Sequence, residues 1–519
     1  MALLEGSRCF ALSALVSEHQ CDAAKTFGEV ARAQHPRPSH FGHHHARCLP
    51  EVFLLFLVAM RPAPSSLVMA QKPSGTFAER YAHGVRLRKK LAREQHADLR
   101  GSADRDALAI LAATDRNRVP ELVAVRYQRM LENPFAFLRG AAAVMAEDLR
   151  HQPSVGIAVQ ACGDCHLMNF GAFATPEQNI LFDINDFDET LPGVDFTADL
   201  KRLSASVAVA ALAAGATKKR ARAMAATTVE AYRGRIRSLA ELSPLEIWHS
   251  KIMLAGEIDH IANRGLRREL KAILAKASDH LAEDDNFPHL VKGTRPRIED
   301  RRPLIYHFKP KGDVRHHVDI KRALDAYAAR LAPDRRCLLD RYALRDVAFK
   351  VVGVGSVGTF CAIGLYTCGD GTPLFLQIKE AGTSVLECLA PKFKGHQGQR
   401  VVEGQRVMQA ASDLFLGWTE DGPSRRQFYV RHLKNRRLGS IGALVEERAL
   451  ASYAGLCGRT LARAHARAAD LAILAGYMGK GGALDDALAS FAMAYAARTQ
   501  DDYERLVRVK RKAAGTGEH

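Results

Sequence analysis

The chain has 519 residues, of which 47% are hydrophobic and 25% are charged. This usage is ordinary for a globular protein, so the composition excludes a fibrous or disordered chain and allows a large core. Lysine and arginine outnumber aspartate and glutamate by 74 to 57, which favours anionic partners, but no arginine run alternates with aromatic residues, so we expect no nucleic-acid partner.

The first 75 residues lack a regular helical or strand pattern. Their apolar run, residues 52–60, is too short to span a bilayer and lies too far from the start for a signal peptide. No membrane span is predicted. We expect residues 1–75 to be a poorly ordered leader or to reflect a start codon assigned too far upstream, because Met69 opens a more regular sequence.

Residues 76–283 are predicted to form a helical lobe. Apolar residues recur at helical spacing over 122–130 and 135–149, and an asparagine-proline pair separates these two helices. Further along, residues 199–214 are typical of a buried helix rich in alanine and valine.

A segment inside this lobe has the spacing of a kinase catalytic loop, with Asp164, four residues, and then Asn169. An acidic run containing Asp183, Asp186 and Asp188 follows it. In phosphoryl transfer, one aspartate orients the acceptor hydroxyl, while an asparagine and a second aspartate hold magnesium. We assign these roles to Asp164, Asn169 and Asp186, because the sequence from Asp186 mimics the Asp-Phe-Gly of kinases. Asp183 and Asp188 are the alternative metal ligands.

Residues 284–340 are predicted to be a linker with a helical excursion, because proline, glycine and charged residues are frequent over 284–317. Strand patterns then cluster in residues 341–440, where three apolar runs, a helix over 399–412 and two further runs follow one another. This is the order of a kinase small lobe. Residues 441–519 are predicted to be helices that pack on the catalytic lobe.

The loop between the first two predicted strands has the pattern G-x-G-x-x-G, formed by Gly353, Gly355 and Gly358. In kinases such a loop covers the nucleotide phosphates, and a lysine on the third strand, here Lys379, contacts them. We expect Glu403 to orient Lys379, with Glu387 as the alternative. The glycine pattern alone is more typical of a tight hairpin, and only its combination with the other segments favours a nucleotide site.

Cys162, Cys165 and His166 also match C-x-x-C-H, the attachment sequence of a c-type haem. That chemistry needs export to an oxidising compartment, and the sequence has no clear export signal. The simpler interpretation is two small apolar cysteines beside a turn. Zinc is disfavoured because no second C-x-x-C or histidine pair has suitable spacing. The ten cysteines lack paired spacing, which indicates a reducing compartment and a cytoplasmic location.

Several segments carry a resemblance to a known family. They are residues 126–127, 135, 139–140, 163–164, 169–171, 185–189, 199–200, 353–358, 377–381, 400–405 and 461–466. Over about residues 75–510 the chain resembles the bacterial family catalogued as domain of unknown function 2252. Its loops are also similar to those of aminoglycoside and choline phosphotransferases. That similarity implies that Asp199 braces the catalytic loop, although this chain has Cys162 where those enzymes carry a histidine.

Together these patterns predict an α+β, kinase-like two-lobe fold in permuted order, with the helical catalytic lobe before the β-rich nucleotide lobe. The expected function is ATP- and magnesium-dependent phosphotransfer to a hydroxyl or amine of a small molecule. The alternative is a non-catalytic, nucleotide-binding regulator of the pseudokinase type, which the presence of Asp164, Asn169 and Asp186 together disfavours.

Overall fold

The computed structural model describes residues 74–102, 104–260, 264–278, 288–291, 296–307, 318–433 and 447–515. They belong to the unit formed by Ser65–His519. The expectation for residues 1–75 therefore lies outside the described residues, apart from the last two, and so does much of the predicted linker.

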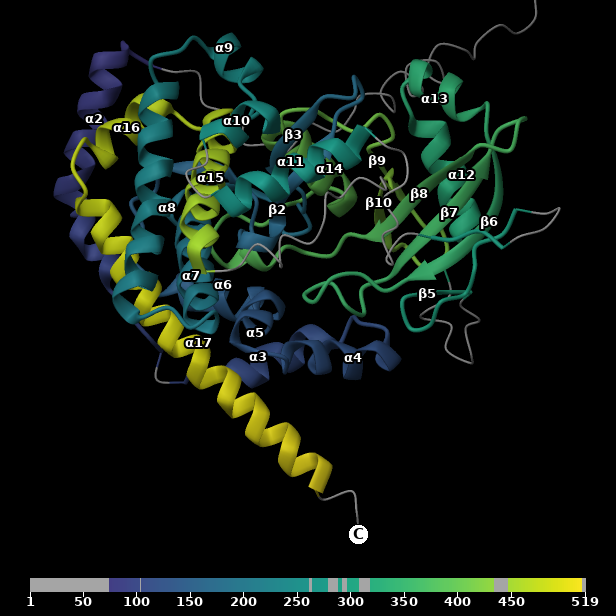
Figure 1. Ribbon diagram of the computed structural model, residues 1–519, viewed down its shortest axis with the longest axis horizontal. Coiled ribbons are helices and arrows are strands. Elements are labelled where there is room, and N and C mark those ends of the chain that lie inside the picture. Colours follow the sequence, from purple (N-terminus) through teal and green to yellow (C-terminus); the bar gives the residue numbers. More distant parts are fainter. Residues whose placement is uncertain are drawn as a thin grey trace, which may run out of the picture. The chain divides into compact units, whose positions relative to one another are not determined.

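Helices make up the first part of the described chain and return at its C-terminus (Figure 1). They are α2 (Phe77–Lys90), η1 (Arg93–Ala97), α3 (Ala107–Asp115), α4 (Pro120–Met130), α5 (Pro134–Gly140), α6 (Ala142–Arg150), α7 (Thr197–Ala213), α8 (Lys218–Leu239), α9 (Pro244–His249), α10 (Leu254–His260), α11 (Arg264–Ser278), α15 (Glu447–Ala466), α16 (Leu471–Met478) and α17 (Ala483–Gly515). Helix α15 packs on α8, and α17 packs on α7 and α8. Helix α7 is buried along nearly its whole length and so forms the centre of this helical part.

The helix predicted over residues 135–149 is broken in two at Ala141. The side chain of Asn133 caps the start of α5 by accepting a hydrogen bond from the Ala136 amide at 2.8 Å. At the end of α5, the carbonyl oxygens of Leu138 and Gly140 each accept a hydrogen bond from a buried arginine side chain. These tertiary bonds draw the last turn of α5 away from a continuous helix.

Six antiparallel strands form the later part of the fold, in the order β5-β6-β7-β8-β10-β9. Their bounds are β5 (Ile305–Tyr306), β6 (Ala343–Lys350), β7 (Cys361–Thr367), β8 (Pro373–Glu380), β9 (Gly417–Glu420) and β10 (Gln427–His432). Helices α12 (Ile320–Arg330) and α13 (Pro333–Leu339) precede β6, and α14 (Gln397–Met408) lies between β8 and β9. The α+β class and the order, helices first and sheet later, are confirmed.

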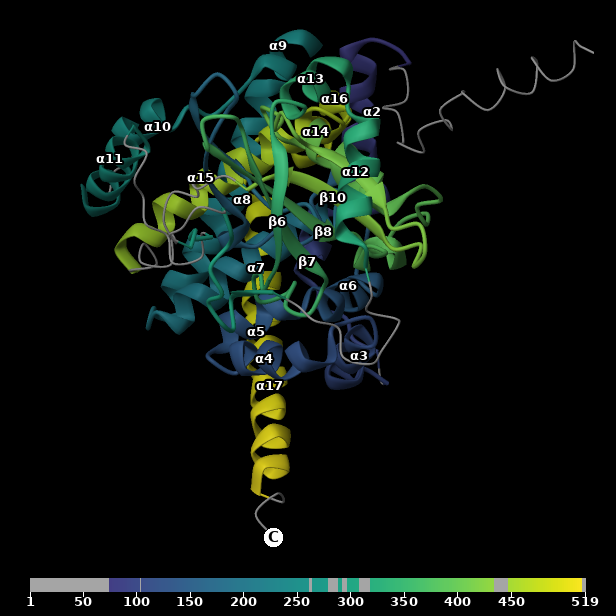
Figure 2. The same ribbon diagram turned by 90° about the vertical axis from the view of Figure 1, so that its right-hand side faces the viewer.

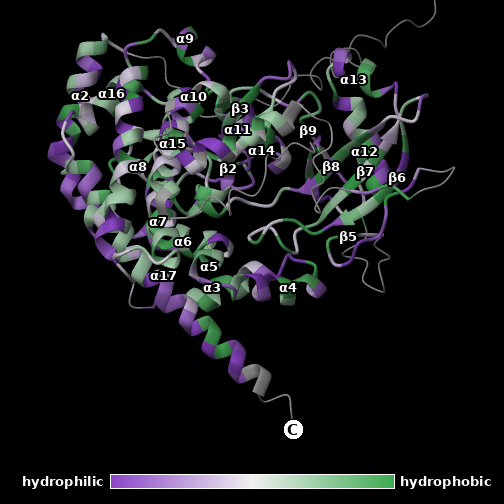
Figure 3. Cartoon of the chain, viewed as in Figure 1, coloured by the Kyte–Doolittle hydropathy of each residue, from purple (hydrophilic) through white to green (hydrophobic). Residues whose placement is uncertain are grey.

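The central strand β7 is buried on both faces of the sheet. All seven residues of β7 are buried, and Figure 3 shows the strand as predominantly hydrophobic. Helix α12 packs against β9, and Figure 2 shows it running alongside the sheet. A core cluster that includes Tyr327, Leu376 and Phe428 fills the space between helix and strands. The short strand β5, inside the predicted linker, extends the sheet beyond β6.

Two short antiparallel ladders lie within the helical part. One pairs β1 (Ala158–Ala161) with β4 (Leu191–Asp195), and the other pairs β2 (Phe170–Ala174) with β3 (Ile180–Ile184). The loop between β1 and β2, residues 162–169, is called the Asp164 loop below. The acidic run, residues 183–189, covers the end of β3 and most of the connection to β4. The Asp164 loop and the acidic run are therefore each continuous with paired strands, which fixes their position.

Among the residues that the structure describes, no helix has the length and apolar character needed to cross a bilayer.

Candidate active site

Lys379 and Asp188 form the centre of the site. Strand β8 is almost wholly buried, and it directs Lys379 inward so that only 3% of its side chain is exposed. The ammonium pairs with Oδ2 of Asp188 and donates a hydrogen bond to Oγ of Ser356 at 3.1 Å. From the neighbouring strand β10, the hydroxyl of Tyr429 donates to Oδ1 of Asp188 at 2.8 Å. Both carboxylate oxygens are therefore engaged by the sheet.

Opposite charges keep this lysine ionised despite its burial. Burial by itself would lower the pKa of Lys379, but attraction to Asp186 and Asp188 outweighs it and raises that pKa above its ordinary value. Burial also raises the pKa of Tyr429, and the negative charge of Asp188 adds to the rise. The tyrosine therefore stays a neutral hydrogen-bond donor, and the lysine stays a cation.

Asp186 lies beside this pair. Its Oδ1 accepts a hydrogen bond from the Asp188 amide at 3.3 Å, and its charge acts on Lys379. Carboxylate and amide oxygens are the ligands that magnesium prefers. Asp186, Asp188 and Asn169 offer such oxygens, and the structure links them, because the Asn185 amide donates to the Asn169 carbonyl at 2.8 Å. These residues are of the types that could hold a magnesium ion.

The Asp164 loop holds its aspartate in a network of fixed donors. Arg202 of α7 donates from Nε to Oδ1 of Asp164 at 2.8 Å. Asn169 donates from Nδ2 to the Asp164 carbonyl at 2.6 Å, which closes the loop on itself. Nε2 of His166 lies 3.6 Å from Oδ2 of Asp164. Burial lowers the pKa of His166 to about 3, so this imidazole is neutral at physiological pH.

Asp199, on the first turn of α7, anchors the same loop from behind. Its carboxylate accepts hydrogen bonds from the amides of Cys162 at 2.7 Å and Gly163 at 3.0 Å. It also contacts Nε2 of His465 at 3.1 Å, and Nδ1 of His465 lies 2.9 Å from the Tyr232 hydroxyl. This is the bracing arrangement that the similarity to phosphotransferases implies for Asp199.

The glycine loop, residues 353–358, connects β6 to β7 and reaches across to the helical part. A Cβ on Gly355 would lie 2.9 Å from the carbonyl oxygen of Arg139 and 3.8 Å from Oδ2 of Asp164. Only a residue without a side chain allows this approach. Arg129 and Arg118 donate to the carbonyls of Gly353 and Val357. The structure thus brings the glycine loop and the Asp164 loop, about 190 residues apart, into direct contact.

Asp183 has a different position from the other aspartates. Its side chain is fully buried and forms an ion pair with Arg463 of α15. It also accepts hydrogen bonds from the amides of Ile184 at 2.9 Å and Ala410 at 2.8 Å. These contacts tie β3 to α15 and to the segment after α14, and they do not include Lys379.

The two glutamates expected to orient Lys379 have other partners in the described part of the chain. Glu403 of α14 accepts a hydrogen bond from Nε2 of Gln399 at 2.7 Å. Glu387, in the short helix η4 (Val385–Cys388), accepts one from the Phe393 amide at 3.2 Å. The structure thus brings Asp188, rather than Glu403, onto Lys379.

Arg400 is a site residue that the sequence reasoning missed. From α14 it donates from Nη2 to the carbonyls of Asp188 at 2.9 Å and Gly382 at 2.8 Å, and its Nη1 donates to the Thr190 carbonyl. It therefore clamps the end of the acidic run to the segment after β8. The signals in the sequence are its place one turn before Glu403, on the same helix, and its inclusion in the segment 400–405 that carries the family resemblance.

Glu189 carries a carboxyl group that titrates near neutrality. Burial raises its pKa to about 7, although the Val385 amide, which donates to Oε2 at 2.8 Å, acts in the opposite direction. Its carbonyl lies so close to Gly163 that a Cβ there would meet it at 2.4 Å. With a φ of +93°, Gly163 is a position that requires glycine on both grounds.

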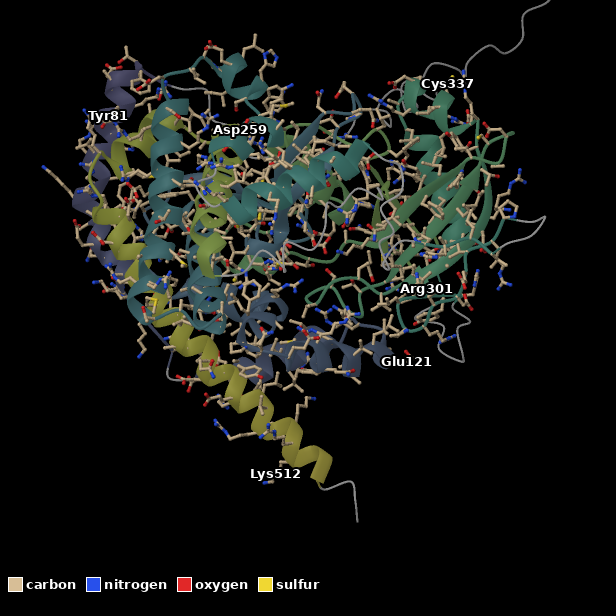
Figure 4. All side chains as sticks on the ribbon, in the orientation of Figure 1. Tyr81, Glu121, Asp259, Arg301, Cys337 and Lys512 are labelled. Atoms are coloured by element: carbon tan, nitrogen blue, oxygen red, sulfur yellow. The ribbon has the colours of Figure 1, made fainter. Side chains whose placement is uncertain are left out.

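The two cysteines of the C-x-x-C-H pattern are buried and free. Ligand atoms of Cys162, Cys165 and Asp199 lie within 4.8 Å of one another, a grouping that could hold a metal ion. The hydrogen bond between the two cysteines and burial raise the pKa of the Cys162 thiol, while burial raises that of Cys165. Since Asp199 already accepts bonds from the loop amides, we interpret this group as part of the brace. Exposed cysteines lie elsewhere, such as Cys337 on α13 (Figure 4).

The fold and the site define an α+β protein in which loops of a helical part meet a six-stranded sheet at a cluster of acidic and basic side chains. The chain belongs to the family described as uncharacterized protein conserved in bacteria, DUF2252, whose model matches residues 118–509. The resemblance noted in the sequence is thereby confirmed. Neither the curated proteins nor the solved structures yielded a match.

Proposed function

We propose that this protein is an ATP- and magnesium-dependent phosphotransferase that acts on a hydroxyl or amine of a small molecule. The observation that carries the proposal is the ion pair between Lys379 and Asp188, formed next to the contact between the glycine loop and Asp164. Phosphoryl transfer needs these elements together: a phosphate-binding cation, metal-binding carboxylates and an aspartate facing the acceptor.

In this proposal, the segments have the kinase-like roles predicted from the sequence. Lys379 binds nucleotide phosphates, and the loop of Gly353, Gly355 and Gly358 covers them. Asp186, Asp188 and Asn169 would hold magnesium, which neutralises charge on the transferred group. The alternation of strands and helix from β6 to β10, with α14 after the third strand, supports the same comparison with a kinase small lobe.

Asp164 is proposed to orient the acceptor or to accept its proton. The hydrogen bond from Arg202 and the brace through Asp199 fix the carboxylate in one position. Fixing a reacting group in advance is a principal contribution to such reactions, because phosphoryl transfer requires little covalent chemistry from the protein.

A nucleotide-binding regulator is the second candidate, and one contact favours it. Ser356 of the glycine loop bonds both Lys379 and Asp188, so the loop occupies the position that phosphates would take in an enzyme. A regulator could retain this closed loop, whereas an enzyme must open it in each cycle.

Transfer of label from [γ-³²P]ATP distinguishes the two candidates. Full-length protein with magnesium is incubated with pools of small hydroxyl and amine compounds, and labelled products are separated from phosphate. A phosphotransferase produces a labelled compound, and Asp164→Asn abolishes it. Magnesium-dependent ATP binding without any transfer supports the regulator. Absence of ATP binding overturns both.

A further inference from the structure

Buried arginines in this protein are generally matched by carboxylates. Five of them form ion pairs with aspartates at 2.8 Å or less: Arg105 with Asp148 and Asp502, Arg126 with Asp115, Arg202 with Asp164, Arg233 with Asp485 and Arg463 with Asp183. This pattern is expected, because a guanidinium removed from water is stable only when its charge and donors are satisfied.

Arg400 is buried as well, and backbone carbonyls satisfy its donors. Arg139, which is half-buried, differs from all of these. It lies on the last turn of α5, and its Nε is buried without a hydrogen-bond partner among the described residues. No ion pair within the described part of the chain includes it. Burial lowers the pKa of Arg139, and the strongest compensating charge is that of Asp164, which already pairs with Arg202. Two guanidiniums thus share one carboxylate at this point.

The neighbouring groups do not supply the missing negative charge. His166, whose pKa responds to both Asp164 and Arg139, is neutral. Glu132 attracts Arg139 only at a distance and is exposed. The nearby Arg129 adds a further positive charge and donates to the Gly353 carbonyl. The surroundings of Asp164 on the side of α5 are therefore positive overall.

The structure assigns to Arg139 the binding of an anionic group, a carboxylate or a phosphate, carried by the acceptor molecule. The guanidinium offers paired donors that match either anion. Its charge interacts with that of Asp164, and its backbone carbonyl adjoins Gly355, which also adjoins Oδ2 of Asp164. Asp164 is the group that would face the acceptor. Attribution of the anion to an acceptor rests on the proposed function, whereas the anion site itself does not.

Binding of inorganic phosphate to the full chain tests this assignment. Titrations at constant ionic strength are followed by calorimetry, with and without saturating magnesium and a non-hydrolysable ATP analogue. The analogue displaces phosphate bound near Lys379 but leaves phosphate bound at Arg139. We expect Arg139→Gln to weaken the remaining binding about tenfold or more, the usual effect of losing a charged hydrogen bond. Acetate, titrated in parallel, shows whether a carboxylate binds more tightly than phosphate.

Two further variants make the outcome decisive. Arg116→Gln removes an exposed arginine just after α3 and should leave phosphate binding unchanged. Arg139→Lys keeps the charge but loses the paired donors, so binding should be intermediate. Removal of an unpaired buried charge should not lower the melting temperature, which separates loss of binding from unfolding. The assignment is wrong if the wild type binds neither phosphate nor acetate. It is also wrong if the wild type and Arg139→Gln bind these anions equally well. Failure of the ATP analogue to bind contradicts only the proposed function.

Discussion

Lys379 of β8 and Asp188 of the acidic run form a buried ion pair although 191 residues separate them in the sequence. The lysine is enclosed by the sheet, while the aspartate comes from the loop between β3 and β4. One contact therefore joins the two halves of the proposed site, and its strength can be measured.

Loss of Asp188 should lower the stability of the fold more than loss of Lys379 does. Asp188→Asn leaves the ammonium of Lys379 buried with only Asp186 to balance it, and we expect a loss of about 2–3 kcal/mol in the free energy of unfolding. Lys379→Met removes the buried charge itself and should cost only about 1 kcal/mol. Chemical denaturation of both single variants and the double variant measures the coupling. Additive losses would show that the pair contributes nothing to folding.

Substitution of Asp164 and Asp186 should separate the proposed phosphoryl transfer from nucleotide binding. Asp164→Asn should lower turnover by about 10²- to 10⁴-fold, the usual contribution of a general base, while the melting shift with magnesium and ATP persists. Asp186→Asn removes a proposed metal ligand and should lower both the turnover and the melting shift. When magnesium-ATP is present at a hundred times its dissociation constant, the free energy of unfolding of the wild type should rise by about 2.7 kcal/mol. Equal damage to ATP binding from both variants would contradict these roles.

The brace formed by Asp199 should be detectable by hydrogen exchange. Asp199→Ala leaves the buried amides of Cys162 and Gly163 without an acceptor, which should cost about 3 kcal/mol. We expect amides of residues 162–167 to exchange faster, while those of the six-stranded sheet change little. Asp370→Ala, in the turn between β7 and β8, serves as the control. Unchanged exchange in the Asp164 loop would rule out the bracing role.

The close approach of the glycine loop should make Gly355 intolerant of a side chain. A Cβ at this position would lie 2.9 Å from a backbone carbonyl, so the loop must shift. Gly355→Ala is expected to destabilise the protein by about 1–3 kcal/mol, as overpacking does. Gly369→Ala meets no atom within 4 Å and should stay within about 0.5 kcal/mol of wild type. Thermal unfolding of the two variants provides the comparison.

The raised pKa of Glu189, about 7 against an ordinary value of 4.5, predicts a pH-dependent stability. Between these values the folded protein binds more protons than the unfolded chain, so this residue makes stability fall as pH rises. Glu189→Gln should therefore match wild type near pH 4 and exceed it above pH 7, by on the order of 2 kcal/mol. Melting temperatures across this range, with exposed Glu132→Gln as control, measure the effect. A difference in melting temperature between Glu189→Gln and the wild type that does not change with pH would contradict the raised pKa of Glu189.

Much of the local structure follows from the sequence. The apolar, branched runs on either side of the glycine loop become β6 and β7, and the run that ends near Lys379 becomes β8. Helix α14 appears within two residues of its predicted start, because helical periodicity is a short-range property. The first of the two runs predicted after this helix becomes β9, which begins only at Gly417, where pairing with β10 begins. Strand ends depend on a partner that the run itself does not contain.

The partners of the charged residues were decided by tertiary structure alone. The sequence favoured Asp186 as the metal ligand, with Asp183 and Asp188 as alternatives. The docking of α15 buries Asp183 against Arg463 and leaves Asp188 for Lys379. Likewise, Glu403 lies on the predicted helix, but it accepts a hydrogen bond from Gln399, one turn earlier on that helix, instead of pairing with Lys379. The sequence by itself determined which segments carry the charged residues and the glycine pattern of the proposed site, since residue type and local pattern suffice for that. Which charges meet depends on how distant elements pack, because a Coulomb interaction is set by separation in space and by burial.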